Sequence, residues 1–243
     1  MRVDCDGNSR AIPVVGPNIT YDEFLGRFLH PLQPCIITGL TNSWPAIKEW
    51  TTIDTASGSL VPNCTALRDT FGAYDGCITF CGETDGNGDF SEREMPVAQF
   101  IDEFRTNSDD GRSRKTYLKD FHFMRVNPSL RPPYTVPLYF QGIKLVLWIV
   151  LMADDWFNRF ALANNNDDFR FLYLGEDGSF TPLHHDVCMS HSWSTSLCGK
   201  PQFQNIYNCR DQSLDVNLSR LCWASLWLKW TLAEDNKLHG AQV

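Results

Sequence analysis

The sequence has no run of basic residues and no apolar run long enough to cross a membrane. Lys and Arg number 21 against 29 Asp and Glu, which gives a formal net charge of −8. Nucleic-acid surfaces gather Lys and Arg, so this balance argues against one. The most apolar stretch, residues 143–153, is shorter than the roughly 20 residues that span a bilayer. We therefore expect no nucleic acid and no membrane among the partners, and the oligomeric state stays unknown.

The first residues also lack the apolar core of a signal peptide. We therefore expect a cytoplasmic protein, with the nucleus as the alternative. In that setting the nine cysteines are reduced thiols rather than disulfides, and their spacing does not match a zinc framework.

A length of 243 residues with 43% hydrophobic residues predicts one domain with a real core. Only six histidines are present, and His184, His185 and His191 lie close together, with Asp186 and Cys188 between them. This is the densest group of possible metal ligands in the chain.

Two geometries fit this group. On a strand, His184 and Asp186 share a face, an arrangement suited to non-haem iron. On a helix, His184, Cys188 and His191 align instead, which suits zinc. Pro182 and the small-residue alternation over residues 190–198 favour the strand, and zinc remains the weaker alternative.

The motif Thr-Pro-Leu-His-His-Asp at residues 181–186, followed by a Trp and then Cys-Gly-Lys, resembles the jumonji-C (JmjC) class of Fe(II)/2-oxoglutarate oxygenases. The resemblance covers about residues 19–140 and 153–200. Further segments agree in order: Tyr-Asp-Glu-Phe at 21–24, Trp-Pro-Ala at 44–46, Tyr-Leu-Lys-Asp at 117–120, Val-Pro-Leu-Tyr-Phe at 136–140 and Asp-Trp at 155–156.

This resemblance implies a mainly β fold with helices (α+β), a JmjC/cupin-like double-stranded β-helix preceded by N-terminal helices. Residues 1–18 are expected to form a flexible arm, and residues 19–200 a partial oxygenase domain with an insertion at about 141–152. Residues 201–243 resemble nothing in the family, so we expect a divergent tail and a barrel that lacks its C-terminal part.

The resemblance also implies the site. His184 and Asp186 would bind Fe(II), and Thr181 and Ser194 would contact the 2-oxoglutarate co-substrate. The family couples oxidative decarboxylation of 2-oxoglutarate to hydroxylation of a protein, here a lysine of a translation termination factor.

Two departures from the family weaken this reading. Pro201 stands where the family has the lysine for the far carboxylate of 2-oxoglutarate, and His239 is the only later histidine that could complete the iron triad. The alternative is a truncated, inactive product that acts at most as an interaction module.

Spacing predicts the elements themselves. We expect helices over residues 21–29, 67–72, 95–105 and 221–232, the first capped by Thr20 and Glu23 and the last carrying Trp223, Trp227 and Trp230 at helical spacing. We expect strands over residues 34–39, 77–81, 116–118, 171–174 and 190–198, and we expect Trp44 and Trp50 to pack in or around the core.

Overall fold

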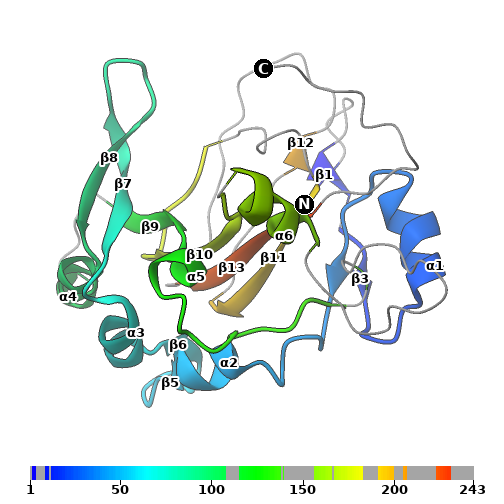
Figure 1. Cartoon of the computed structure of the whole chain (residues 1–243), viewed down its shortest axis with the longest axis horizontal. Helices are drawn as coiled ribbons and strands as arrows, with labels where there is room; N and C mark the ends of the chain where they lie inside the picture. Colours follow the sequence, from blue (N-terminus) through cyan, green and yellow to red (C-terminus); the bar gives the residue numbers. More distant parts are fainter. Residues whose placement is uncertain are drawn as a thin grey trace.

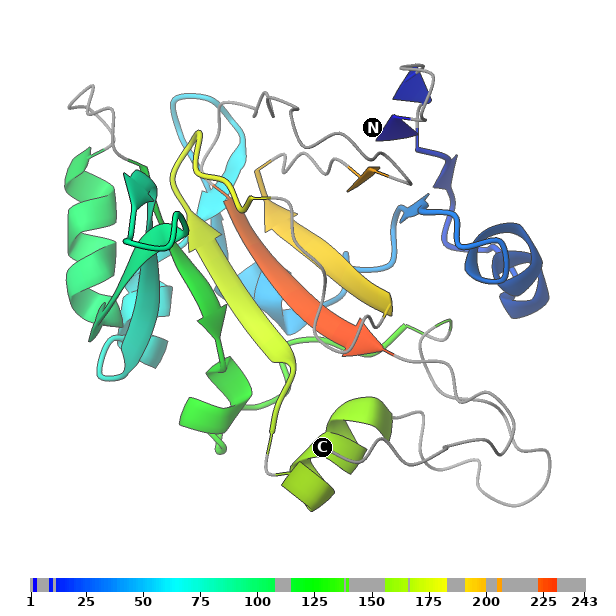
Figure 2. The same ribbon diagram turned by 90° about the horizontal axis from the view of Figure 1, so that it is seen from above.

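The computed structural model describes residues 2–3, 9–10, 12–107, 115–137, 139, 156–165, 167–182, 191–199, 205–206 and 223–230. The largest element in these ranges is an antiparallel six-stranded sheet in the order β11-β13-β10-β9-β7-β8. Its strands are β7 (Asp75–Thr84), β8 (Phe90–Pro96), β9 (Lys115–Phe121), β10 (Arg170–Gly175), β11 (His191–Cys198) and β13 (Trp223–Trp230). Figure 2 shows β13 lying between β10 and β11.

Short strands form three smaller sheets. β1 (Arg2–Val3) pairs with β2 (Ser9–Arg10) and with β12 (Asn205–Ile206). β3 (Val14–Val15) pairs in parallel with β4 (Ile36–Ile37), and β5 (Thr51–Ile53) pairs with β6 (Leu60–Pro62). The stretch for which the sequence predicts an extended arm thus contributes β1, β2 and β3.

The helices of the described residues are α1 (Tyr21–Phe24), the π-helix η1 (Leu25–Leu29), α2 (Pro45–Glu49), α3 (Cys64–Phe71), α4 (Val97–Asn107), α5 (Phe123–Val126) and α6 (Trp156–Asn165). The predicted N-cap at Thr20 is confirmed, since the Glu23 backbone N–H donates to Thr20 Oγ1 at 3.2 Å. The reciprocal half of the capping box, from the Glu23 carboxylate, stays a prediction, and that carboxylate pairs with Arg27. In the described part of the chain, no helix is both long and apolar enough to traverse a bilayer.

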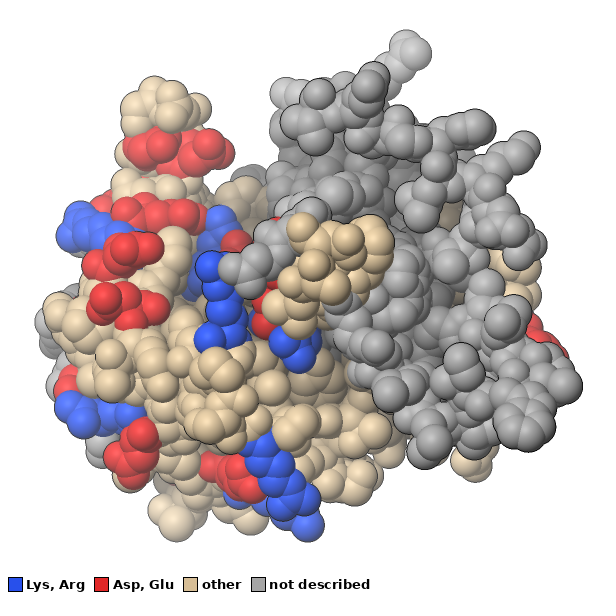
Figure 3. All heavy atoms as spheres, viewed as in Figure 1, with Lys and Arg blue, Asp and Glu red and all other residues tan. Residues whose placement is uncertain are grey.

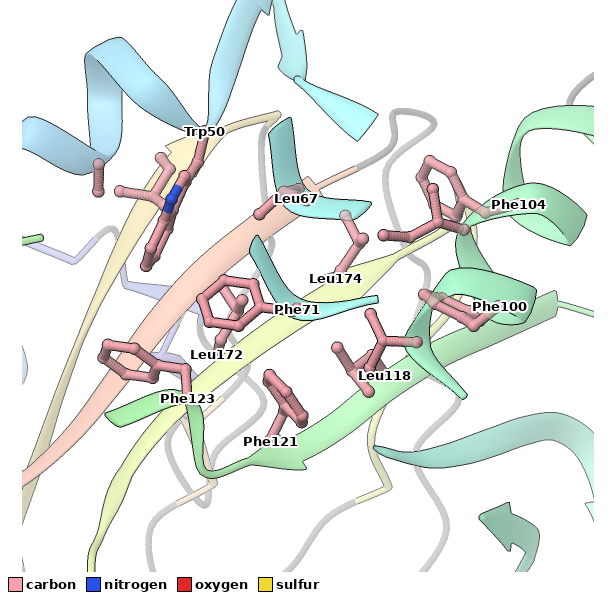
Figure 4. Close-up of a cluster of buried hydrophobic side chains, with 14 of the residues drawn as sticks. Trp50, Leu67, Phe71, Phe100, Phe104, Leu118, Phe121, Phe123, Leu172 and Leu174 are labelled. Carbon is pink, nitrogen blue, oxygen red and sulfur yellow. The ribbon is translucent and has the colours of Figure 1, made fainter. Parts of the chain in front are cut away.

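One face of the large sheet packs against α2, α3 and α4 to form the main core, shown in Figure 4. Trp44 and Trp50 are 3% and 2% exposed, so their predicted packing role is confirmed. Trp50 meets Phe71 edge to face, with ring centroids 5.4 Å apart, a favoured aromatic geometry. Because apolar side chains fill this face of the sheet, the polar side chains of the same strands point to the opposite face.

A second buried cluster joins the first helices to the rest of the molecule. Phe24, Phe28, Leu29 and Tyr139 form it, and Trp193 of β11 packs against both clusters. In Figure 1, α1 lies at the opposite end of the molecule from the β7–β8 hairpin. Trp193 is therefore a point at which the N-terminal helices are attached to the sheet.

The helix predicted over residues 221–232 is wrong. Residues 223–230 form β13, which pairs with β10 on one side and β11 on the other. The sequence WASLWLKW is almost continuously apolar, and a short apolar run bonded on both edges is typical of an interior strand. The tail therefore contributes the second strand of the sheet order.

The other predicted elements are confirmed in kind, and their bounds differ by a few residues. β7 and β9 extend beyond the predicted residues 77–81 and 116–118, and α3 begins before residue 67. The large sheet with helices on one face confirms the β-rich α+β class. The predicted insertion at 141–152 lies outside the described residues.

Candidate active site

Two of the four predicted site residues fall within the described part of the chain. Thr181 follows β10, shortly after a turn at Gly178 with φ +83°, and Ser194 lies within β11. The predicted iron ligands His184 and Asp186 lie outside the described residues, so their role stays a prediction. Among the described residues, no group of three His, Cys, Asp or Glu side chains could hold a metal ion.

The zinc alternative needs a helix that runs through His191. β11 begins at His191, so this residue lies in a strand and the helical alignment with His184 and Cys188 is wrong at that end. The strand over residues 191–198 confirms instead the period-2 pattern of small residues.

The large sheet carries polar side chains on the face opposite α2, α3 and α4. On β9 the residue between Tyr117 and Lys119 packs in the core, so these two side chains belong to the other face. β7 pairs Thr79 with Tyr117 and Cys77 with Lys119, and Thr79 also pairs with Glu92 of β8. Because directly paired residues share a face, these five side chains lie together.

Thr181 reaches this polar face through Tyr117. The Thr181 hydroxyl donates to the Tyr117 hydroxyl oxygen at 3.1 Å. Tyr117 is 1% exposed, and burial raises the pKa of its hydroxyl, against the opposing effect of hydrogen bonds with Thr181 and Thr79. Tyr117 is therefore a neutral hydroxyl at physiological pH.

Tyr117 lies in a family-like signature, but the sequence alone predicts no role for it. The alternation along β9 is the signal that could have found it, since it places Tyr117 and Lys119 on one face.

A row of hydroxyls leads across this face to Glu92. Thr79 donates to Glu92 Oε1 at 3.3 Å. Tyr117 pairs with Thr79 across β9 and β7, and Thr181 donates to Tyr117. The hydroxyls of Thr181, Tyr117 and Thr79 thus form a contiguous group that ends at the carboxylate of Glu92.

Glu92 accepts two further bonds. Lys119 Nζ lies 2.7 Å from Glu92 Oε1, and Cys77 Sγ lies 3.4 Å from Glu92 Oε2. Burial raises the pKa of Glu92, but the hydrogen bond and charge of Lys119 outweigh it and leave the pKa below its usual value. Burial likewise lowers the pKa of Lys119, and Glu92 outweighs it and raises the net value. Both groups are therefore charged at neutral pH.

Cys77 stays a thiol beside this ion pair. Burial raises the pKa of Cys77 to about 12, and the neighbouring charge of Glu92 adds to the effect. A thiol with so high a pKa is a poor nucleophile at neutral pH.

A strained residue follows Lys119. Asp120 has φ +48°, in the left-handed region that non-glycine residues rarely adopt, and the register between β9 and β10 shifts at this point. The Tyr173 hydroxyl of β10 donates to Asp120 Oδ1. Such strain is concentrated at functional sites in proteins.

Ser194 lies on the same face as Tyr117 but at a distance. Trp193 and Leu197 pack in the core, so Ser194 faces the other way. In register it aligns through β13 with Phe171, whereas Tyr117 aligns with Gly175. That offset is four residues along β10 and three strands across, or roughly 13 Å by roughly 14 Å. Ser194 is thus well separated from Tyr117 along the sheet, and the role of Ser194 stays a prediction.

Charge is distributed unevenly over the face of the molecule in Figure 3. Acidic side chains gather over the β7–β8 hairpin, and Lys and Arg lie between and below them. The hairpin sequence supplies Glu83, Asp85, Asp89, Glu92 and Glu94. The polar face thus lies next to an acidic edge.

Comparison with known proteins identifies the class. The cupin-like domain family matches residues 21–207, which is more than half of the chain. The chain therefore belongs to the cupin-like family, and curated relatives that it matches are named as 2-oxoglutarate and iron-dependent oxygenases.

Three relatives illustrate this. The "2-oxoglutarate and iron-dependent oxygenase JMJD4" of Danio rerio is 32% identical over 200 residues, which are 81% of this chain and 43% of that protein. The protein of the same name from Homo sapiens is 30% identical over 188 residues, 76% of this chain and 40% of that protein. The "Arginine-specific demethylase JMJ20" of Arabidopsis thaliana is 31% identical over 203 residues, 77% and 40%. The chain thus spans about two fifths of the length of these relatives.

Proposed function

We propose that this chain forms the oxygenase domain of a Fe(II)- and 2-oxoglutarate-dependent protein hydroxylase. The observation that carries the proposal is the hydrogen-bonded pair of Thr181 and Tyr117 on the polar face of the sheet. Thr181 is the residue for which the family resemblance implies contact with the co-substrate carboxylate. The names of the JMJD4 relatives support the same co-substrate and metal.

The chemistry of the described residues fits a carboxylate. Thr181 and Tyr117 offer two hydroxyls at 3.1 Å from each other, and Lys119 adds an ammonium group on the same face. Hydroxyl and ammonium donors are the partners that a carboxylate needs when it leaves water. The burial of Tyr117 strengthens such bonds, because they form away from bulk solvent.

His184 and Asp186 would hold the iron in this proposal. The bound iron and 2-oxoglutarate would supply oxygen activation, with succinate and carbon dioxide as the products of the co-substrate. The part of the chain described here would bind and orient the co-substrate and exclude water from one side of it.

The finer proposal is hydroxylation of a lysine in a translation termination factor, in the cytoplasm. The names of the relatives favour more than one target, because one of them is called an arginine-specific demethylase. Mass spectrometry of the product separates the two outcomes. Hydroxylation adds an oxygen atom to an unmodified lysine peptide, whereas demethylation removes a methyl group from a methylated arginine peptide.

A second candidate is the same fold without turnover, acting as an interaction module. Pro201 favours it, because the family's co-substrate lysine is absent from that position. The two candidates differ in a measurable way, since an interaction module need not bind 2-oxoglutarate at all.

The first test is co-substrate binding. Calorimetry with 2-oxoglutarate and Mn(II), which replaces iron without turnover, should detect a complex in the unaltered chain. Thr181→Val and Tyr117→Phe each remove a hydroxyl and should weaken binding by roughly 5- to 20-fold. The control is Thr70→Val on α3, where the hydroxyl donates only within its helix, to Ala66 O at 2.7 Å; it should leave binding unchanged. Absence of metal-dependent binding would refute the proposal.

The second test is turnover. Succinate formation from 2-oxoglutarate with Fe(II) should be abolished by His184→Ala and by Asp186→Ala. Binding without succinate formation, with or without a termination-factor peptide, would favour the interaction module.

A further inference from the structure

The described polar face holds a cation that the co-substrate could use. Lys119 lies two residues from Tyr117 on β9, and its ammonium reaches Glu92 at 2.7 Å. The Lys119 side chain is 30% exposed, so a ligand in solution can reach it. Tyr117 and Lys119 lie two residues apart on the same face of β9, a separation of roughly 7 Å along a strand. A dicarboxylate held by Thr181 and Tyr117 that extends along this face would therefore approach the cation.

We propose that Lys119 is the cation that binds the far carboxylate of the co-substrate beside Tyr117 and Thr181, with Glu92 as its resting counter-ion. This inference rests on the proposed function. It assigns to β9 the charge that Pro201 cannot supply.

Glu92 opposes anion binding in two ways. Its carboxylate forms an ion pair with the ammonium of Lys119, which a ligand would have to replace. Its negative charge, next to the Thr79 hydroxyl, also repels an arriving carboxylate. Removing Glu92 should therefore strengthen 2-oxoglutarate binding, whereas removing Lys119 should weaken it.

The experiment measures the affinity of the full chain, loaded with Mn(II), for 2-oxoglutarate by calorimetry. Lys119→Met should weaken binding by about 10- to 100-fold, the cost of one charge-assisted hydrogen bond, and Lys119→Arg should restore part of it. Glu92→Gln should tighten binding by roughly 2- to 5-fold, because the uncharged amide neither forms an ion pair with Lys119 nor repels the carboxylate of the co-substrate.

A second ligand isolates the far carboxylate. 2-Oxobutyrate keeps the 2-oxo acid group but lacks the far carboxylate, so Lys119→Met should hardly change its affinity. The preference of the unaltered chain for 2-oxoglutarate over 2-oxobutyrate should therefore be lost in the variant. Circular dichroism and denaturation midpoints check that each variant is folded.

The matched control is Arg68→Met, which removes a cation from an exposed pair with Asp102 between α3 and α4. It should leave both affinities unchanged. If the unaltered chain binds 2-oxoglutarate and Lys119→Met binds it equally well, Lys119 is a structural partner of Glu92 and the inference is wrong, while the proposed function stands. If the unaltered chain does not bind 2-oxoglutarate, both are wrong.

Discussion

Asp168 is a fully buried carboxylate at the point where β10 begins. It is 0% exposed and accepts from Arg170 Nε at 2.6 Å, from Arg170 Nη2 at 2.7 Å and from the Arg170 backbone N–H at 3.1 Å. The neighbouring Phe169 backbone N–H donates to Asn158 of α6 at 2.7 Å. These bonds fix the start of the strand that leads to Thr181.

Asp168→Asn should destabilise the chain by about 2–4 kcal/mol, because it removes the carboxylate that faces a largely buried guanidinium. The amide can accept through its oxygen only and carries no charge. Urea denaturation measures the loss, as the shift in midpoint multiplied by the slope. The control is Asp102→Asn in the exposed pair with Arg68, for which little or no change is expected. Equal midpoints for the two variants would contradict the assignment of Asp168 as a structural group.

At the scale of elements, local pattern decided most of what could be predicted. The cap at Thr20, the alternation along residues 191–198 and the apolar run at 171–174 each depend on neighbours in sequence, and each was found. Pairing partners depend on residues far apart, so the register that places Thr79 beside Tyr117 could not be read from either strand alone. The shift in register near Asp120 also depends on how β9 pairs with β10, so the sequence of β9 alone does not predict it.

The misassignment of β13 shows the limit of periodicity. Trp223 and Trp227 share a face on a strand as well as on a helix, since their spacing of four residues fits both periods. What settles the element is two neighbouring strands, β10 and β11, that each bond to it. In the candidate site, Thr181 came from resemblance, whereas Tyr117, Lys119 and Glu92 become a group only through the pairing of β7, β8 and β9.

Gly76 of β7 tests how closely this sheet packs on its helices. A Cβ at this position would lie 2.5 Å from Leu118 Cδ1 and 3.3 Å from Val97 Cγ2. Both neighbours are buried, at 1% and 2% exposure. Gly76→Ala should therefore destabilise the chain by about 1–3 kcal/mol through overpacking.

Thermal and urea denaturation measure that effect. Gly86, in the turn between β7 and β8, has nothing within 4 Å of the added Cβ, so Gly86→Ala is the control and should change the midpoint little. A Gly76→Ala variant as stable as the control would mean that the β7–β9–α4 packing relaxes more readily than the buried contacts indicate.

At the scale of the whole molecule, the candidate site lies where an acidic hairpin meets an aromatic core. The core fixes β9 and β10 through Leu118, Leu172 and Leu174, which are each 1% exposed. The hairpin brings Glu92 across β7 to Lys119. The ion pair between Lys119 and Glu92 therefore contributes to the fold. It also fixes the position of the lysine that we propose as the co-substrate's partner. Removal of Glu92 should therefore lower stability but raise ligand affinity, whereas removal of Lys119 should lower both.

Stability as a function of pH tests this dual role. The folded pKa of Glu92 lies below its usual value, so its contribution is present above the usual glutamate range and is lost as the pH falls through the lowered value. The folded pKa of Lys119 is raised, so its contribution is present below the usual lysine value and is lost as the pH rises through the raised one. The pair should therefore stabilise the fold across the whole interval between the two.

Urea midpoints of the unaltered chain and of Glu92→Gln, measured without ligand, should differ most at neutral pH and converge as the pH falls below the usual value of 4.5. Above pH 10.5, the usual lysine value, they should converge again as Lys119 loses its proton. At neutral pH the same variant should be less stable than the unaltered chain yet bind 2-oxoglutarate more tightly. A variant that loses stability and affinity together would show that Glu92 supports the site rather than restrains it, because a collapsed polar face weakens both quantities at once.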